Sequence, residues 1–167
     1  MPGPELSIIV PTFNERDNVV RLVELLDSSL SDVQWELIVV DDDSPDRTAD
    51  QVRWLANSNH RVRCIQRIGR RGLSSACIEG MLSSSAPFLA VMDGDLQHDE
   101  RLLVDMLRHL KQGGFDVVIG SRYTTGGSIG EWQGIRALTS RWATLLSRPL
   151  VPVGLTDPMS GFVALRR

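Results

Sequence analysis

Two short apolar runs decide the fold class of this chain. The first is Leu6-Ser7-Ile8-Ile9-Val10, which ends at Pro11, and the second is Glu36-Leu37-Ile38-Val39-Val40, which ends at three aspartates. Short runs rich in β-branched residues and bounded by turn-forming residues are typical of buried strands. The residues between them predict a helix capped by Asn14, because apolar residues recur three and four positions apart: Val19, Val20, Leu22, Val23, Leu25, Leu26 and Leu30.

The same alternation of strand and helix continues along the chain. We expect further strands at 62–66, 88–92, 116–120 and 161–167, and further helices at 48–56, 73–83, 100–111 and 132–150. Continuous apolar strands that alternate with helices form a mostly parallel sheet that is covered on both faces. The predicted fold class is therefore α/β, a three-layer α/β/α sandwich with a mostly parallel central sheet.

The composition fits one globular domain. The chain has 167 residues, of which 42% are hydrophobic and 23% charged, and its formal net charge is −3. This balance argues against a disordered chain and against the broadly basic surface of nucleic-acid-binding proteins. No apolar run approaches the ~18 residues of a membrane span, and residues 1–5 do not resemble a signal peptide, so we expect a cytoplasmic protein. Cys64 and Cys77 lie in apolar surroundings and are expected to be buried thiols.

Polar residues follow the predicted strands, at the edge of the sheet where ligands bind in folds of this class. After the first strand comes Pro11-Thr12-Phe13-Asn14-Glu15, and after the second comes Asp41-Asp42-Asp43-Ser44-Pro45-Asp46. The aspartate run can be a solvated turn in which Asp43 or Ser44 caps the next helix. Capping alone does not account for three carboxylates, which favours a binding role.

The fourth strand is followed by Asp93-Gly94-Asp95-Leu96-Gln97-His98. Two carboxylates at a bend that glycine permits can direct oxygen ligands at one divalent cation, Mg²⁺ or Mn²⁺, and Gln97 adds a neutral oxygen. An Asp-x-Asp pair on its own is usually a surface turn, but its position directly after a strand favours a metal site. His98 is either a neighbour of the metal or a residue without a special role, and the second is favoured because magnesium sites prefer oxygen ligands.

Basic and glycine-rich segments lie before the third helix and after the fifth strand. The segment 67–76 contains three arginines and two glycines, and it can either hold an anion or form a basic solvated loop. It has neither the P-loop nor the dinucleotide-binding glycine spacing. Arg122 follows the fifth strand and suits phosphate binding, and residues 126–130 can form a mobile cover of the site.

The segment 132–150 predicts an amphipathic helix that has two interpretations. Arginines alternate with its apolar residues, which are Ile135, Leu138, Trp142, Leu145 and Leu146. Packing onto the sheet accounts for the apolar stripe, whereas arginines beside tryptophans are also typical of a helix at a membrane interface. For the stripe alone, packing is the favoured interpretation.

Six motifs together resemble glycosyltransferase family 2, and within it the dolichol-phosphate or polyprenol-phosphate mannose synthases. They occur in the order found in that family and span nearly the whole chain: residues 9–15, 40–46, 70–76, 93–98, 120–123 and 157–162. The resemblance implies a GT-A type nucleotide-sugar transferase fold. It also implies a metal-dependent transfer of mannose from GDP-mannose to a polyprenyl (dolichyl) phosphate, with inversion of the anomeric centre.

The resemblance further implies roles for individual residues. The nucleoside would contact Pro11, Phe13, Glu15, Val40 and Asp42, and the metal would contact Asp93, Asp95 and Gln97, with Gly94 between them. Arg122 and Arg136 would face the phosphates of donor and acceptor, and with Asp95 they form the expected catalytic set. Phe13 and Arg47 stand where tyrosine and glycine are common in relatives. Asp157 would either shape the acceptor side or belong to a turn.

The residues also fit this chemistry independently of the resemblance. A leaving sugar diphosphate develops negative charge, which a divalent cation stabilises as a Lewis acid. The acceptor phosphate is already ionised near neutral pH, so that arginines can align it and no strong general base is required.

The resemblance also bears on the extent of the domain and on its partners. Residues 1–167 are expected to form a single catalytic domain that lacks the C-terminal part of the family, either as a truncated core or with a separate membrane-anchoring partner. It would act peripherally at the cytosolic face of a membrane and bind no nucleic acid. Two alternatives stay open: a transferase that uses another nucleotide sugar, carrying glucose or an aminoarabinose derivative, and a catalytically silent nucleotide-sugar-binding module.

Overall fold

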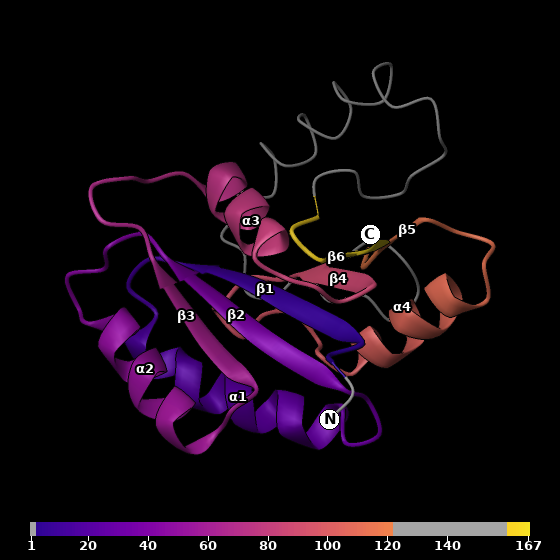
Figure 1. Cartoon of the computed structure of the whole chain (residues 1–167), viewed down its shortest axis with the longest axis horizontal. Coiled ribbons are helices and arrows are strands. Elements are labelled where there is room, and N and C mark those ends of the chain that lie inside the picture. Colours follow the sequence, from indigo (N-terminus) through magenta and orange to yellow (C-terminus); the bar gives the residue numbers. More distant parts are fainter. Residues whose placement is uncertain (1–2, 122–159) are drawn as a thin grey trace, which may run out of the picture.

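The computed structural model describes residues 3–121 and 160–167, which form a six-stranded sheet flanked by helices (Figure 1). In chain order the elements are β1 (Leu6–Thr12), α1 (Arg16–Ser29), β2 (Trp35–Asp41), α2 (Thr48–Ser58), β3 (Val62–Gln66), α3 (Leu73–Leu82), β4 (Phe88–Val91), α4 (Leu102–Lys111), β5 (Val117–Ile119) and β6 (Val163–Arg166). The strand order is β3-β2-β1-β4-β6-β5. Strands β1 to β4 are parallel, and β6 lies antiparallel between β4 and β5. The predicted α/β sandwich with a mostly parallel sheet is confirmed.

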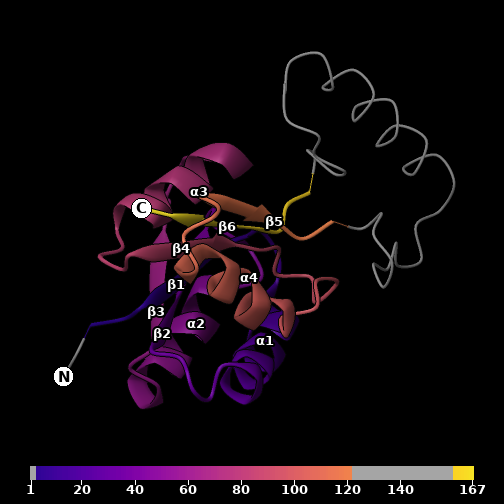
Figure 2. The same ribbon diagram turned by 90° about the vertical axis from the view of Figure 1, so that its right-hand side faces the viewer.

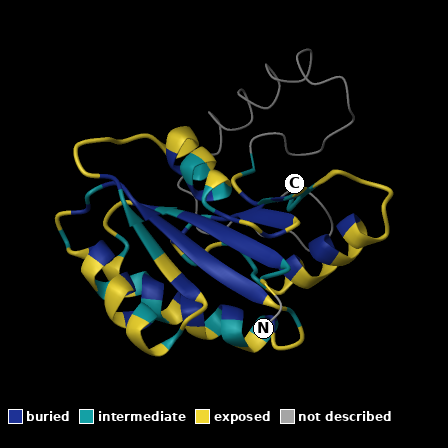
Figure 3. Ribbon diagram, in the orientation of Figure 1, coloured by how far each residue is buried: buried dark blue, intermediate teal, exposed yellow. Residues whose placement is uncertain are grey.

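Alternate strand residues face two separate apolar layers. On one face, Ile8, Val10 and Leu37 pack with α1, α2 and α4. On the other face, Ile9 and Val40 pack with α3, the one described helix on that side (Figure 2). Figure 3 shows the result: the central strands are buried, and the outer surfaces of the helices are exposed. Helices on both faces explain why these strands read as continuous apolar runs.

Gly80 allows α3 to lie close to the sheet. A Cβ atom at this position would be 2.5 Å from Ile9 Cγ2 and 3.0 Å from Val40 Cγ2. Both distances are shorter than ordinary carbon–carbon contacts, which lie near ~3.5–4.0 Å. A larger residue would therefore push α3 away from the strands that carry the site.

The first strand continues through Pro11 to Thr12, which corrects the prediction that it ends at Pro11. Proline has no N–H to donate, so it is normally absent from central strands. The Ile9 carbonyl accepts the N–H of Met92, beyond the last residue of β4. Because alternate residues face the same neighbour, Pro11 also faces that side, where β4 has already ended. Its missing N–H therefore breaks no ladder hydrogen bond.

The predicted cap of the first helix is wrong. Helix α1 is preceded by Glu15 at the N-cap position, and Asn14 has a left-handed backbone with φ of 63°. The backbone N–H of Asn14 donates to Ser44 Oγ at 3.0 Å, so this residue joins two loops instead of capping a helix. The other helices and strands lie where they were predicted, with ends displaced by a few residues. The helix expected at 132–150 lies outside the described residues.

The final strand joins the sheet between two strands that are distant in sequence. Val163 of β6 pairs with both Val91 of β4 and Ile119 of β5. Next to this pairing, the N–H of Gly120 donates to the Phe162 carbonyl at 2.9 Å, and Ser160 Oγ donates to the Gly120 carbonyl at 2.6 Å. The ends of β5 and β6 are therefore fixed to each other.

Two further expectations concern membranes and cysteines. Within residues 3–121 and 160–167, no helix has the length and apolar character needed to span a membrane. Cys64 and Cys77 are free thiols, but both are half-buried rather than fully buried. Burial raises the pKa of Cys64 to about 11 and raises that of Cys77 as well. Both side chains pack against the apolar layers, so the prediction of buried thiols is met only in part.

Candidate functional site

The polar residues that follow β1, β2 and β4 converge at one edge of the sheet. Strands β1 and β2 run in parallel register, with Pro11 beside Val40 and Thr12 beside Asp41. Gly94, after β4, lies next to the first loop, because a Cβ on it would be 3.5 Å from Glu15 Cγ. The predicted meeting of these segments at the carboxyl ends of the strands is confirmed.

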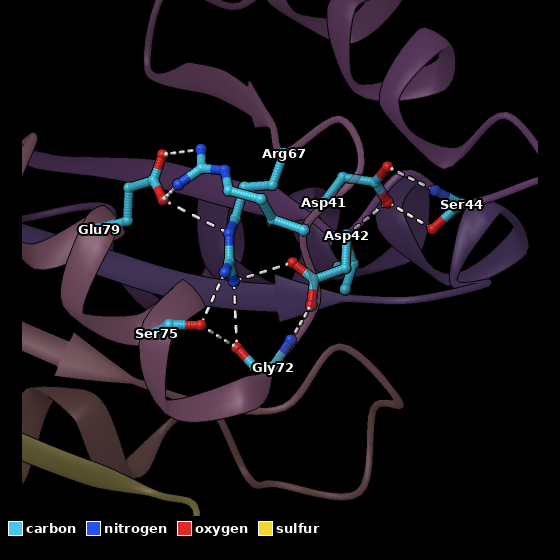
Figure 4. Close-up of polar contacts among 9 residues, drawn as sticks. Asp41, Asp42, Ser44, Arg67, Gly72, Ser75 and Glu79 are labelled. Atoms are coloured by element: carbon cyan, nitrogen blue, oxygen red, sulfur yellow. Dashed lines mark hydrogen bonds and ion pairs between the residues drawn. The ribbon is translucent and has the colours of Figure 1, made fainter.

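The three consecutive aspartates have three different environments. Asp41 is fully buried and accepts hydrogen bonds from Thr12 Oγ1 at 3.1 Å, the Ser44 N–H at 3.0 Å and Ser44 Oγ at 2.5 Å (Figure 4). Asp43 accepts one hydrogen bond, from Gln66 Nε2 at 2.9 Å. Asp41 therefore shapes the loop, because it is buried and its hydrogen bonds go to groups of the protein itself.

Asp42 is the aspartate that is held between two loops. One carboxylate oxygen accepts the N–H of Gly72 at 2.7 Å, and the other lies 2.9 Å from Arg67 Nη1 (Figure 4). The second oxygen, Oδ1, is buried and has no hydrogen-bond donor among the described residues. Both oxygens of Asp42 are thus engaged inside the protein, one by the Gly72 N–H and the other by the charged Arg67 guanidinium.

The loops after β1 and β2 are tied together by side chains that the sequence did not single out. Thr48 Oγ1 accepts the N–H of Glu15 at 3.1 Å, and Asp46 accepts the N–H of Arg16 at 3.1 Å. Burial alone would raise the pKa of Asp46, but hydrogen bonds from Thr48 and Arg16 lower it overall. The available signal is the turn-forming composition of residues 44–48, for which capping by Asp43 or Ser44 was one alternative beside a binding role.

The N-cap position of α2 is occupied by Arg47, which has a left-handed backbone with φ of 66°. Neither Asp43 nor Ser44 caps this helix, so that alternative is wrong. A left-handed conformation costs least for glycine. The backbone geometry therefore explains why glycine suits this position, which is occupied by glycine in many relatives and by Arg47 in this chain.

An aromatic ring lies at the open side of the edge. Phe13 is 43% exposed, and the guanidinium of Arg71 is 4.3 Å from the centre of its ring. Phe13 and Arg71 therefore meet across the loops that follow β1 and β3. An exposed ring beside the acceptor Asp42 suits a planar, nitrogen-rich ligand such as a nucleobase.

The Asp93–Gln97 turn contains the candidate metal ligands. Asp95 Oδ1 accepts the N–H of Gln97 at 3.1 Å, and Leu96 between them has a left-handed backbone with φ of 62°. The described residues contain no cluster of three or more His, Cys, Asp or Glu side chains able to bind a metal. Two carboxylates and an amide oxygen nevertheless fit Mg²⁺ or Mn²⁺, because such ions are commonly held by one or two carboxylates together with substrate phosphates.

His98 contacts this candidate metal site, although the sequence analysis favoured no special role for it. Its Nε2 atom is 3.1 Å from Asp93 Oδ2, and its ring stacks on Phe162 with 5.0 Å between centroids. Gly161 lies on the same carboxylate, since a Cβ there would be 3.0 Å from Asp93 Oδ2. The segment before β6 therefore orients Asp93 both directly and through His98. Only the tertiary structure brings these residues together.

A substitution at Gly161 tests this contact. Gly161→Ala is expected to lower the affinity for Mn²⁺ about tenfold, because the added methyl group displaces the Asp93 carboxylate that it would touch. Electron paramagnetic resonance of free Mn²⁺ measures the affinity without any turnover. Gly114→Ala is the matched control, because a Cβ there meets nothing within 4 Å. Equal Mn²⁺ affinity in the two variants would contradict the assignment of Asp93.

The arginines of segment 67–76 have partners within the protein. Arg67 is buried against Asp42, and Arg70 pairs with Glu79 through two contacts of 3.0 Å. Arg71 lies over Phe13. The open choice between an anion site and a solvated basic loop is thus resolved for Arg67, which is neither solvated nor free for an anion.

Several predicted residues lie outside the described part of the chain. They are Arg122, Arg136, Asp157, the glycine-rich residues 126–130 and the helix at 132–150.

Comparisons with known proteins agree with this architecture. Residues 7–167 match the model of glycosyl transferase family 2. A dolichol-phosphate mannosyltransferase of Pyrococcus furiosus is 41% identical over 98% of this chain and 46% of its own length. One from Saccharomyces cerevisiae is 36% identical over 98% of this chain and 61% of its own length. The chain therefore spans about half to three fifths of the curated relatives that it matches.

Solved structures show the same fold. Glucosyl-3-phosphoglycerate synthase from Mycobacterium tuberculosis has a TM-score of 0.70 at 23% identity, covering 98% of this chain and 57% of that one. A mannosyltransferase from Pyrobaculum calidifontis, in complex with GDP-Man and Mn²⁺, has a TM-score of 0.66 at 18% identity, covering 100% of this chain and 46% of that one. The GT-A architecture expected from the sequence is thereby confirmed.

Proposed function

This chain belongs to glycosyl transferase family 2, and we propose that it transfers mannose from GDP-mannose to a polyprenyl or dolichyl phosphate with inversion of the anomeric carbon. The observation that carries the proposal is the convergence of Asp42 and the Asp93–Gln97 turn at one sheet edge, in a chain that is 36–41% identical to dolichol-phosphate mannosyltransferases. A nucleoside site and a diphosphate site are then adjacent, as a nucleotide-sugar donor requires.

The donor site is assigned by residue. Pro11, Phe13, Glu15, Val40 and Asp42 would hold the nucleoside, and this is supported by the exposed Phe13 ring at the same edge of the sheet. Asp93, Asp95 and Gln97 would hold Mg²⁺ or Mn²⁺, with Gly94 giving the donor close access to the backbone. Arg122 and Arg136 are proposed to contact the donor and acceptor phosphates, on the family resemblance and their chemistry alone.

The chemistry follows from these positions. The bound divalent cation would supply Lewis-acid stabilisation of the leaving diphosphate. Asp93 and Asp95 act by orientation and charge, with no proton transfer assigned to them, because the acceptor phosphate is already ionised near neutral pH. Arg122 and Arg136 would align the two phosphates, since the guanidinium fork binds phosphate oxygens in pairs.

The acceptor places the reaction at a membrane surface. A polyprenyl chain is held in the bilayer and only its phosphate reaches the water, so the protein would bind peripherally, at the cytosolic face where GDP-mannose is available. We propose residues 1–167 as one catalytic domain, with membrane attachment through its own further residues or a separate membrane-anchoring partner.

A transfer assay tests the proposed function. Radiolabelled mannose from GDP-mannose is expected to enter an organic-soluble product only when polyprenyl phosphate and Mg²⁺ or Mn²⁺ are both present. UDP-glucose and an aminoarabinose donor are tested in parallel as competing donors. Preferential transfer from either of them would contradict mannose as the donor sugar. Binding of GDP-mannose without product would instead identify a silent binding module.

A further inference from the structure

Arg67 is a buried cation beside the nucleoside site that the proposed reaction does not use. It follows β3, and its side chain is only 3% exposed. Its backbone N–H donates to the Asp41 carbonyl at 2.8 Å, which fixes the start of its side chain at the end of β2. A buried arginine is costly unless charged and polar groups surround it, so its contacts show what it holds in place.

The guanidinium of Arg67 joins three separate segments (Figure 4). Nη1 lies 2.9 Å from Asp42 Oδ1 and donates to the Gly72 carbonyl at 3.0 Å. Nη2 donates to Ser75 Oγ at 2.6 Å, and Nε lies 3.4 Å from Glu79 on α3. One side chain therefore links the loop after β2, the loop after β3 and helix α3.

These contacts control the orientation of Asp42 from both sides. Arg67 contacts one oxygen of this carboxylate directly, and through the Gly72 carbonyl it fixes the peptide segment whose N–H binds the other oxygen. The Arg67 contact with Asp42 Oδ1 is an ion pair without hydrogen-bond alignment. Asp42 is thus held in one orientation at the edge of the nucleoside site.

We propose that Arg67 is a positioning residue for nucleotide binding, which acts through Asp42 and does not itself contact the donor. This inference rests on the proposed function, because it requires Asp42 to bind the nucleoside. Lysine cannot replace Arg67, because a single ammonium group cannot reach Asp42, Gly72, Ser75 and Glu79 at once.

The test is a double-mutant cycle measured by calorimetry with GDP and Mn²⁺. Arg67→Lys and Asp42→Asn are each expected to weaken GDP binding by at least about tenfold, and the double variant is expected to bind no more weakly than Asp42→Asn alone. Arg63→Lys is the matched control, since Arg63 also lies 2.9 Å from a carboxylate, that of Glu36, but away from the site. It is expected to bind GDP like the wild type.

A second variant covers the case in which Arg67→Lys does not fold, which thermal unfolding followed by circular dichroism would show. Glu79→Gln keeps Arg67 and weakens its attachment to α3, together with the exposed pair between Glu79 and Arg70. It is expected to weaken GDP binding about threefold, and to have no effect when Asp42→Asn is already present.

The outcomes separate this inference from the proposed function. A wild-type protein that binds no GDP with Mn²⁺ overturns the proposed function and this inference with it. If the wild type binds, and Arg67→Lys binds equally well, only the role of Arg67 is overturned. Effects of Arg67→Lys and Asp42→Asn that multiply in the double variant would show that Arg67 contacts the nucleotide independently, and would also overturn it.

Discussion

Replacing both Asp93 and Asp95 by alanine is expected to abolish mannosyl transfer, with the rate falling at least about a thousand-fold. The two carboxylates are the charged members of the proposed metal site, and the leaving diphosphate has no comparable stabilisation once they are gone. Incorporation of radiolabelled mannose into organic-soluble product measures the rate. Calorimetry measures whether GDP-mannose affinity still depends on the metal.

Asp99→Asn is the matched control for this double variant. Asp99 belongs to the same segment, but its carboxylate pairs with Arg101 at 2.8 Å on the surface, and hydrogen bonding to Arg101 lowers its pKa. Transfer by Asp99→Asn should match the wild type. The metal assignment fails if GDP-mannose binds with the same affinity to the wild type, to the chelated protein and to the Asp93→Ala, Asp95→Ala variant.

Asp41→Asn is expected to lower the free energy of unfolding by about 2–3 kcal/mol, because it leaves two buried donors facing each other. Asp41 Oδ1 accepts hydroxyl groups of Thr12 and Ser44, and Oδ2 accepts the Ser44 N–H. An asparagine can keep its oxygen toward the hydroxyls only by turning its NH₂ group toward that N–H. Urea denaturation monitored by circular dichroism measures the loss.

Asp43→Asn provides the comparison within the same run of aspartates. Asp43 accepts a single hydrogen bond from Gln66, and asparagine tolerates its left-handed backbone with φ of 57°. Its effect is expected to stay below about 1 kcal/mol. Equal losses in the two variants would show that the buried hydrogen bonds of Asp41 do not stabilise this loop.

The sequence predicted the architecture because its signals are local. Short β-branched runs and helical spacing identify each element from its own residues, and parallel pairing follows from their alternation. The antiparallel insertion of β6 between β4 and β5 has no such signal, because its partners are far away in the sequence. Asn14 was misinterpreted for a related reason: asparagine suits both an N-cap and a left-handed turn, and only the contact with Ser44 decides between them.

The site was predicted in part. Its position at the carboxyl edge followed from the fold class, and the metal turn followed from residue types next to β4. The residue types alone could not distinguish Asp41, Asp42 and Asp43, which differ only in the loops that surround them; the family resemblance alone singled out Asp42. The contacts of Arg67 with Asp42 and of His98 with Asp93 could not be predicted, since they join loops that meet only in the folded protein.

The hydrogen bonds that join Gly120 to Ser160 and Phe162 have an evolutionary consequence. Because β5 and β6 are neighbours, the chain that connects them begins and ends at nearly the same place in the structure. The entropic cost of such an excursion rises only slowly with its length. Changes in the length of the chain between these two strands during evolution are therefore expected to leave the pairing of β5 with β6 in place.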